Sequence, residues 1–244
     1  MREQVFEQNP SDEKAPQPGG PYLVQMLFKV PVPMPDKESM TAVMQRHIGA
    51  VECFGHDKKM TGFSALDHIA EFKEGKAPVQ LVVMDCIEFT GKGIDAFLMS
   101  QMWDCRKDRE RILRECKYQV VATDMLAGAL PALERANLDA DFVEALAELY
   151  PDCEAFFFQN CGKLLLAEDV RSHQIEGPDR FIWFGVNVRF FNIQGTEDIR
   201  VILTAPNGVD LVVVKVETTE PGLYGVGCAT FTQRYAAVKT VVEE

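Results

Sequence analysis

The chain has 244 residues, of which 47% are hydrophobic and 25% are charged, and its formal net charge is −12 at pH 7. This length allows one large domain or two small ones, with a core that needs no disulfide or metal to hold it. The acidic balance argues against a nucleic-acid backbone or an anionic membrane surface as partner, because both are bound by clustered Lys and Arg.

The cysteines and the N-terminus indicate a reducing compartment. Seven Cys are present without regular spacing and without a Cys-x-x-Cys pair. Residues 1–8 contain no apolar signal core, and no stretch reaches the ~18 apolar residues of a transmembrane helix. We therefore expect a cytoplasmic protein whose thiols are free and mostly buried.

The first part of the chain predicts a disordered tail and then an α+β region. Residues 1–20 are polar and rich in Pro and Gly, which is typical of a loose tail. Residues 21–116 predict an N-terminal α+β half. Its expected elements are a strand over 22–30, a helix over 36–48 capped by Asp36, strands over 50–54, 65–72 and 79–89, a polar loop over 55–62, and helical stretches over 94–102 and 106–116. The last stretch has a charge-laced face that we expect to be solvated.

Residues 117–244 predict a C-terminal α+β half whose clearest unit is a β-α-β segment over 117–158. Its helix, over 131–149, has an apolar stripe at three- and four-residue spacing. The charged residues between these positions, including Arg135 and Asp139, are expected to face water. The strand Ala155–Phe158 is apolar at every position, which is typical of burial on both faces.

Further strands are expected after this unit. They cover 162–167, 180–191, and a hairpin of 199–204 with 210–217, while 232–244 is compatible with a helix or a strand. In the long strand over 180–191, alternation places Trp183, Asn187 and Arg189 on the same face.

The order β-α-β-β-β occurs twice, once from residue 22 to 89 and once from residue 117 to 191. We therefore expect an α+β fold made of two similar halves, a ferredoxin-like-related sandwich with helices packed on antiparallel or mixed sheets, forming one compact unit. The handedness rule for crossovers makes the first two strands of each half candidate parallel neighbours.

Short motifs over residues 98–191 resemble a bacterial family of uncharacterised proteins, domain of unknown function 4261. The motifs are Ser100-Gln-Met-Trp-Asp104, Cys116-Lys-Tyr-Gln-Val120, Asp124 before the helix, Tyr150-Pro-Asp-Cys-Glu-Ala155 with Gly162-Lys163, and Asn187-Val-Arg-Phe190. The resemblance implies a cytosolic α+β protein with no assigned activity.

Six residues are candidate ligand-binding residues. Gln101, Trp103 and Asp104 place an amide, an indole and a carboxylate near a helix end, where they can line a pocket or pack and cap locally. Trp183, Asn187 and Arg189 bring a guanidinium beside an aromatic ring, which suits an anion. The alternative for Arg189 is a structural salt bridge to Asp124 or Glu154.

Other reactive side chains favour structural roles. Cys153 and Cys161, with His173 and Asn160, have the residue types of a Cys-His-Asn catalytic set. Nothing in their spacing indicates a lowered thiol pKa, so we expect buried, unreactive cysteines. Cys53, His56 and His68 supply one closely spaced pair where a zinc site needs two, so we expect no metal. His47 lies on an apolar helix face and is expected in the core.

The sequence contains no phosphate-binding loop, nucleophile elbow or metalloprotease motif, so we assign no catalytic residue and no cofactor. The leading hypothesis is a non-enzymatic cytosolic module that binds another protein or itself. The alternative is a small-molecule sensor with its site in the cleft between the two halves. An enzyme using Asp124, Glu154 or Cys153 would require two of these to converge with perturbed pKa values.

Overall fold

The computed structural model describes residues 21–73, 75–172, 180–192, 199–204 and 210–213. Its strands are β1 Leu23–Phe28, β2 Val51–His56, β3 Met60–Phe72, β4 Gly75–Met84, β5 Ile87–Glu88, β6 Tyr118–Met125, β7 Ala155–Phe158, β8 Lys163–Leu166, β9 Asn187–Asn192, β10 Ile199–Thr204 and β11 Asp210–Val213. Its helices are α1 Lys37–Ile48, α2 Ala96–Ser100, α3 Arg109–Glu115, α4 Ala132–Leu149, α5 Ala167–Arg171 and α6 Arg180–Gly185, with a 3-10 turn, η1, at Ala127–Ala129.

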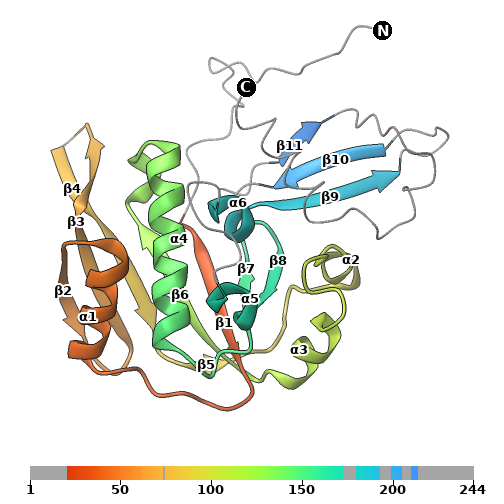
Figure 1. Cartoon of the computed structure of the whole chain (residues 1–244), viewed down its shortest axis with the longest axis horizontal. Helices are drawn as coiled ribbons and strands as arrows, with labels where there is room; N and C mark the ends of the chain where they lie inside the picture. Colours follow the sequence, from red (N-terminus) through yellow and green to blue (C-terminus); the bar gives the residue numbers. More distant parts are fainter. Residues whose placement is uncertain (1–20, 74, 173–179, 193–198, 205–209, 214–244) are drawn as a thin grey trace, which may run out of the picture.

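These elements form an α+β fold, as the sequence predicts. An eight-stranded sheet has the order β2-β3-β4-β6-β1-β7-β8, with β5 beside β6, and a second sheet has the order β11-β10-β9 (Figure 1). Every neighbouring strand pair in both sheets is antiparallel.

The expected parallel neighbours are wrong. β1 lies between β6 and β7, so these two run parallel with one strand inserted between them, and β2 pairs only with β3 at the sheet edge. The handedness rule fixes the direction of a crossover and leaves open whether a third strand enters the gap. β1 suits this central place because Met26 and Leu27, which point to opposite faces, are both fully buried.

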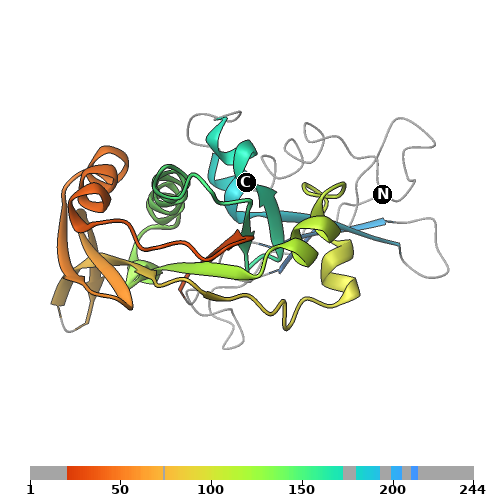
Figure 2. The same ribbon diagram turned by 90° about the horizontal axis from the view of Figure 1, so that it is seen from below.

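Two hydrophobic clusters lie on opposite faces of the large sheet. α1 and α4 lie side by side on one face, where they cover Met26, Phe63, Leu81, Phe156 and other residues of the larger cluster (Figures 1 and 2). The segment containing α2 and α3 covers the opposite face over β1, β7 and β8, through residues such as Met102 and Ile112. The Phe strand, β7, is therefore buried on both faces, as its sequence predicts.

The predicted helix cap is confirmed, and two predicted strands have different bounds. Asp36 caps α1 by accepting a hydrogen bond from the backbone N–H of Ser39 at 2.8 Å. β3 is longer than expected, because Asp57 closes a tight turn by accepting from the N–H groups of Lys59 and Met60, so most of the expected loop over 55–62 is strand. The strand expected over 79–89 is interrupted at Asp85 and Cys86.

The long strand expected over 180–191 is wrong in its first half, which forms α6. Its apolar run is compatible with the periodicity of a helix or of a strand. Tertiary packing selects the helix, because Trp183 and Phe184 both point into the core under α4. Only β9, from Asn187, continues as a strand. The expected tail over 1–20, His173 and the residues after 213 lie outside the described part of the chain.

Candidate functional site

A buried lysine brings three of the six predicted ligand-binding residues together. Lys163, at the start of β8, is 4% exposed. Its ammonium donates to the carbonyl of Val186 at 3.2 Å and lies 3.4 Å from an oxygen of Asp104. A lysine is buried only with partners for its charge, and here the 101–104 segment and the start of β9 supply them.

Asn187 holds the same three segments together. Its side-chain amide donates to the carbonyls of Gln101, Cys161 and Gly162 at 3.2–3.4 Å. Gly162 has a φ of +67°, and a Cβ there would lie 2.6 Å from Leu98, so glycine is needed for the α2 segment to approach this turn. We call Gln101, Asp104, Lys163 and Asn187 the lysine cluster.

Polar atoms of this region remain unsatisfied within the described part of the chain. The side-chain oxygens of Gln101 and Asn187 and the indole N–H of Trp103 are buried without a hydrogen-bond partner there. Buried polar atoms are normally paired with protein or water, because an unpaired one costs about 1–3 kcal/mol. Two acceptors and one donor are therefore able to receive a water or a polar ligand.

The remaining predicted residues are not brought into the cluster. Trp183 stacks on Phe184 with ring centroids 5.5 Å apart, inside the larger hydrophobic cluster. Arg189 pairs with Ile202 in the β9–β10 ladder, and its side chain lies outside the described residues. Its two expected structural partners are engaged elsewhere, since Asp124 pairs with Arg135 and Glu154 with Lys29.

A second polar cluster lies under α4, where the sequence predicted solvated charges. Arg135 binds Asp124 with two nitrogens, at 2.8 and 3.2 Å, and Asp139 lies one helical turn further along α4. Asp124 is 1% exposed and Asp139 is 4% exposed, so the expectation that Arg135 and Asp139 face water is wrong. The four-residue spacing of Arg135 and Asp139 indicates that they are neighbours on one helix face, and this was the sequence signal for the cluster.

The face of the large sheet opposite α1 and α4 carries no helix of the described residues over β2, β3, β4 and β6. Strand alternation and register place eleven residues of the central part of the sheet there, which we call the open face: Glu52, Phe54, Met60, Gly62, Ser64, Gln80, Val82, Met84, Val121, Thr123 and Met125. No helix of the described residues lies on this side of these strands (Figure 2). Phe54, Met84 and Met125 are 48%, 47% and 44% exposed.

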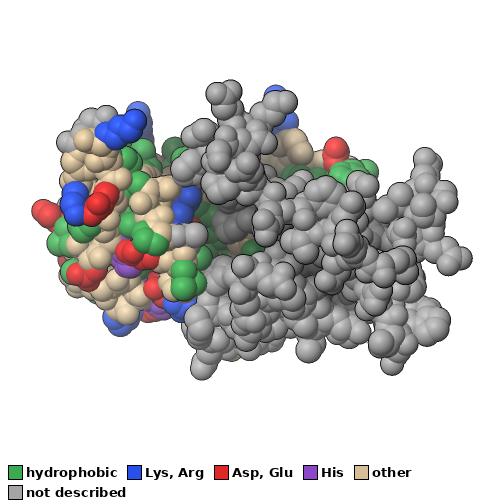
Figure 3. Space-filling model, turned by 90° about the horizontal axis from the view of Figure 1, so that it is seen from above, with side chains coloured by type: hydrophobic (Ala, Val, Ile, Leu, Met, Phe, Trp, Pro, Cys, Tyr) green, Lys and Arg blue, Asp and Glu red, His purple; other side chains and the backbone are tan. Residues whose placement is uncertain are grey.

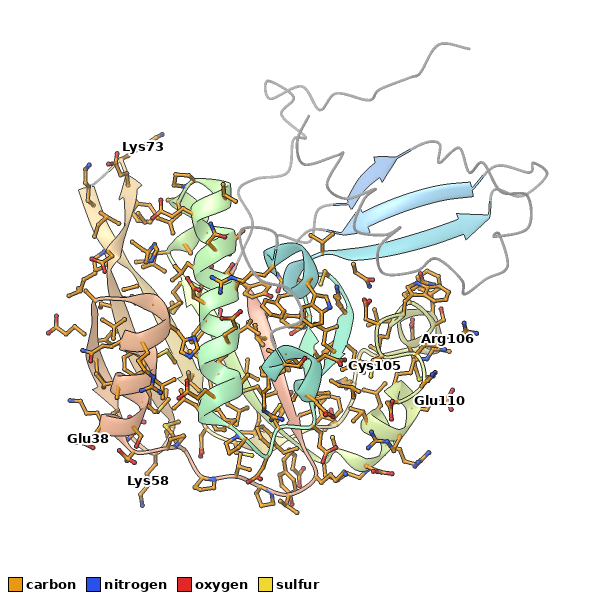
Figure 4. The ribbon with its side chains drawn as sticks, in the orientation of Figure 1. Glu38, Lys58, Lys73, Cys105, Arg106 and Glu110 are labelled. Atoms are coloured by element: carbon orange, nitrogen blue, oxygen red, sulfur yellow. The ribbon has the colours of Figure 1, made fainter. Side chains whose placement is uncertain are left out.

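Nearly all charged side chains lie outside the open face. Acidic and basic groups are interspersed with hydrophobic ones at the end formed by α1 and β2–β4 (Figure 3). In the α2–α3 segment, Arg106 and Glu110 lie on the outer side and Cys105 lies nearer the sheet (Figure 4). Of the eleven residues of the open face, one is charged, Glu52 on the edge strand β2.

The thiols are poorly suited to nucleophilic catalysis. Burial raises the pKa of Cys153 to about 12 and that of Cys161 to about 11, whereas an activated thiol has a lowered pKa. Cys153 and Glu154 lie just before β7, and Asp124 lies near the end of β6 next to Arg135, so the three expected enzyme candidates share no site.

The histidines have separate partners. His56 contacts Thr61, and His68 contacts Glu134, while Cys53 donates to the carbonyl of Gly55. His47 contacts Glu148 at 2.8 Å and its side chain is partly exposed, so it is not a packed core residue. The described residues contain no group of three or more His, Cys, Asp or Glu that could hold a metal.

Comparisons with known proteins find only partial likeness. No family model and no solved structure matches the chain. A D-galactonate dehydratase family member of Musicola paradisiaca is 68% identical over 47 residues, which is 19% of this chain and 11% of that protein. Proteins of the same description from Salmonella virchow and Enterococcus gallinarum are 66% identical over 47 residues and 62% over 48.

These matches do not show the family of the chain. It covers only 11–12% of the length of these three relatives. Among the described residues, no helix has the length and apolar character needed to cross a membrane.

Proposed function

We propose that the protein is a non-enzymatic, cytoplasmic protein-interaction module that docks an apolar surface of another protein, or of a second copy, on the open face. The observation that carries the proposal is the composition of this face. A chain with 37 acidic and 25 basic residues places one of them, Glu52 on the edge strand β2, among these eleven positions. The centres of protein interfaces are depleted in charge and enriched in Met and aromatic residues.

The geometry of the open face supports the same function. The side chain of Phe54 lies over Gly62, because a Cβ on Gly62 would be 2.2 Å from the phenyl ring. Rows of paired residues, Gly62–Val82–Thr123 and Glu52–Ser64–Gln80–Met125, continue the surface across the sheet. Methionine side chains adapt to the shape of a partner, which suits a docking surface.

The test replaces Phe54 and Met84 together by Ser. We expect sedimentation velocity across a concentration range, followed by affinity capture with the immobilised protein, to show a complex that the double variant loses. Leu133→Ser is the matched control, because Leu133 is 56% exposed on α4, away from the open face. Equal losses in both variants, or a complex that survives Phe54→Ser with Met84→Ser, would refute the proposal.

A small-molecule sensor is the second candidate, favoured by the unsatisfied atoms around the lysine cluster. The cluster joins residues of both expected halves, since Gln101 and Asp104 precede residue 117 and Lys163 and Asn187 follow it. Two free acceptors and one indole donor match a neutral ligand whose hydroxyl or amide groups both donate and accept.

A thermal-shift screen of neutral polyols and amides tests this second candidate. A ligand at one hundred times its Kd adds roughly 2.7 kcal/mol to the stability of the folded state. We expect Trp103→Phe, which keeps an aromatic ring and removes the N–H, to weaken the shift. A blank screen, or an undiminished shift in Trp103→Phe, would leave water as the occupant of these positions.

A further inference from the structure

Two carboxyl groups share one guanidinium in the interior, at the point where β6 ends beneath α4. Asp124 accepts two hydrogen bonds from Arg135 and a third from the backbone N–H of Tyr22, the residue before β1. These donors satisfy Asp124 as an ionised group. An Arg fork bound to a carboxylate is among the strongest charge-assisted arrangements in proteins.

Asp139 is less well satisfied. Its Oδ2 lies 3.7 Å from the same Arg135 nitrogen that binds Asp124, and its buried Oδ1 has no hydrogen-bond partner among the described residues. The two carboxyl groups therefore face the same guanidinium nitrogen, 2.8 Å from Asp124 and 3.7 Å from Asp139. Two carboxyl groups can hydrogen-bond directly only when one of them carries a proton, because two carboxylates offer acceptors alone.

No other described group near the pair supplies a positive charge. Tyr22, beside β1, is a titratable neighbour of both carboxyl groups. Burial raises the pKa of Tyr22, so its hydroxyl is neutral at physiological pH. One guanidinium therefore balances two carboxyl groups, and ionising both leaves an excess negative charge in the interior.

The backbone next to Asp124 is unusual in the same place. Leu126, two residues further on, adopts a left-handed conformation with φ +70°, which is unfavourable for a residue other than glycine. Such conformations persist where the surrounding structure enforces them, and they concentrate at sites with a special role.

We propose that Asp124 and Asp139 form a buried proton-binding site, which holds one proton between the two side chains and weakens the packing of α4 on the sheet when that proton is lost. Burial, and then the charge of Asp124, raise the pKa of Asp139 well above its usual value. The folded chain therefore binds this proton more tightly than the unfolded chain. The stability that the proton contributes is fully present below a pH of about 4 and falls as the pH rises through the raised pKa.

This inference does not depend on the open face, and its test uses the full chain. Urea unfolding is measured across pH for wild type, for Asp139→Asn and for the exposed-site control Asp152→Asn. The side-chain amide that Asp139→Asn introduces is a neutral donor, like the protonated acid, but it needs no proton from solution. We expect the folding equilibrium constant of wild type and the control to fall by up to about tenfold per pH unit, and Asp139→Asn to lose that part of the slope.

Equal slopes in wild type and in Asp139→Asn would overturn the proposal. If Asp139→Asn does not fold, carboxyl ¹³C NMR of the wild type decides the question. A carboxyl signal that titrates well above pH 4 and perturbs the Arg135 side-chain resonances supports the proton site. Titration of every carboxyl near pH 4 refutes it.

Discussion

The two ends of the large sheet differ in how many of their faces are covered. β7 and β8 have α4 and α6 on one face and the α2–α3 segment on the other, so Phe156, Phe157 and Leu164 are all buried. In the described part of the chain, β2, β3 and β4 have helices on one face only, and their other face exposes Phe54 and Met84. The doubly covered end buries its large side chains on both faces, whereas the singly covered end leaves large apolar side chains exposed to solvent.

The largest expected difference between the two ends is in the free energy of unfolding after one Phe→Ala substitution in each. Phe156→Ala leaves a cavity in the doubly covered end and should reduce the free energy of unfolding by about 3–5 kcal/mol. Phe54→Ala removes a ring that is already half exposed and should cost no more than about 1 kcal/mol. Urea unfolding of both variants checks the difference, and similar losses would mean that the open face is part of the core.

Ion pairs provide the next comparison. Lys163 is buried with Asp104, whereas Lys76 pairs with Glu71 at the exposed end of the β3–β4 hairpin, with both side chains about two-thirds exposed. Lys163→Met leaves Asp104 without its ammonium and should cost about 3 kcal/mol. Lys76→Met should cost less than about 1 kcal/mol, because water screens that pair. Equal costs, measured by urea unfolding, would contradict the assigned burial.

A smaller effect on stability is expected at Gly62, which lies beneath the ring of Phe54 on the open face. A methyl group on Gly62 would overlap the ring of Phe54, which is the movable end of an exposed side chain. Gly62→Ala should therefore displace the ring at a cost of about 1 kcal/mol or less, and it should weaken docking more than stability. Sedimentation and urea unfolding of this variant measure the two quantities. A large loss of stability with docking intact would contradict the assignment of Gly62 and Phe54 to the docking surface.

The elements that could be predicted from sequence are those fixed by local chemistry. The cap at Asp36, the Phe strand and the α4 helix are readable because a capping side chain, an unbroken apolar run and a helical stripe each specify one structure. α6 could not be predicted, since residues 180–185 suit either a helix or a strand and only the packing of Trp183 under α4 decides.

The lysine cluster was predictable in part. Gln101, Asp104 and Asn187 stood out as polar groups beside apolar segments, and they meet at Lys163. Their convergence could not be derived, because it depends on a strand order in which β1 enters between β6 and β7. Arg135 and Asp139 were assigned to solvent for a similar reason: their burial follows from Asp124 on β6, which only the folded sheet places beneath α4.

Methionine-methyl NMR tests the central claim most directly, because the chain has reporters in both environments. Met84 and Met125 lie on the open face, whereas Met26, Met40 and Met44 are fully buried in the core. When a complex forms, with a second copy or with a captured partner, the account predicts that the open-face signals shift or broaden while the core signals stay unchanged. Complex formation that leaves the signals of Met84 and Met125 unmoved would contradict it.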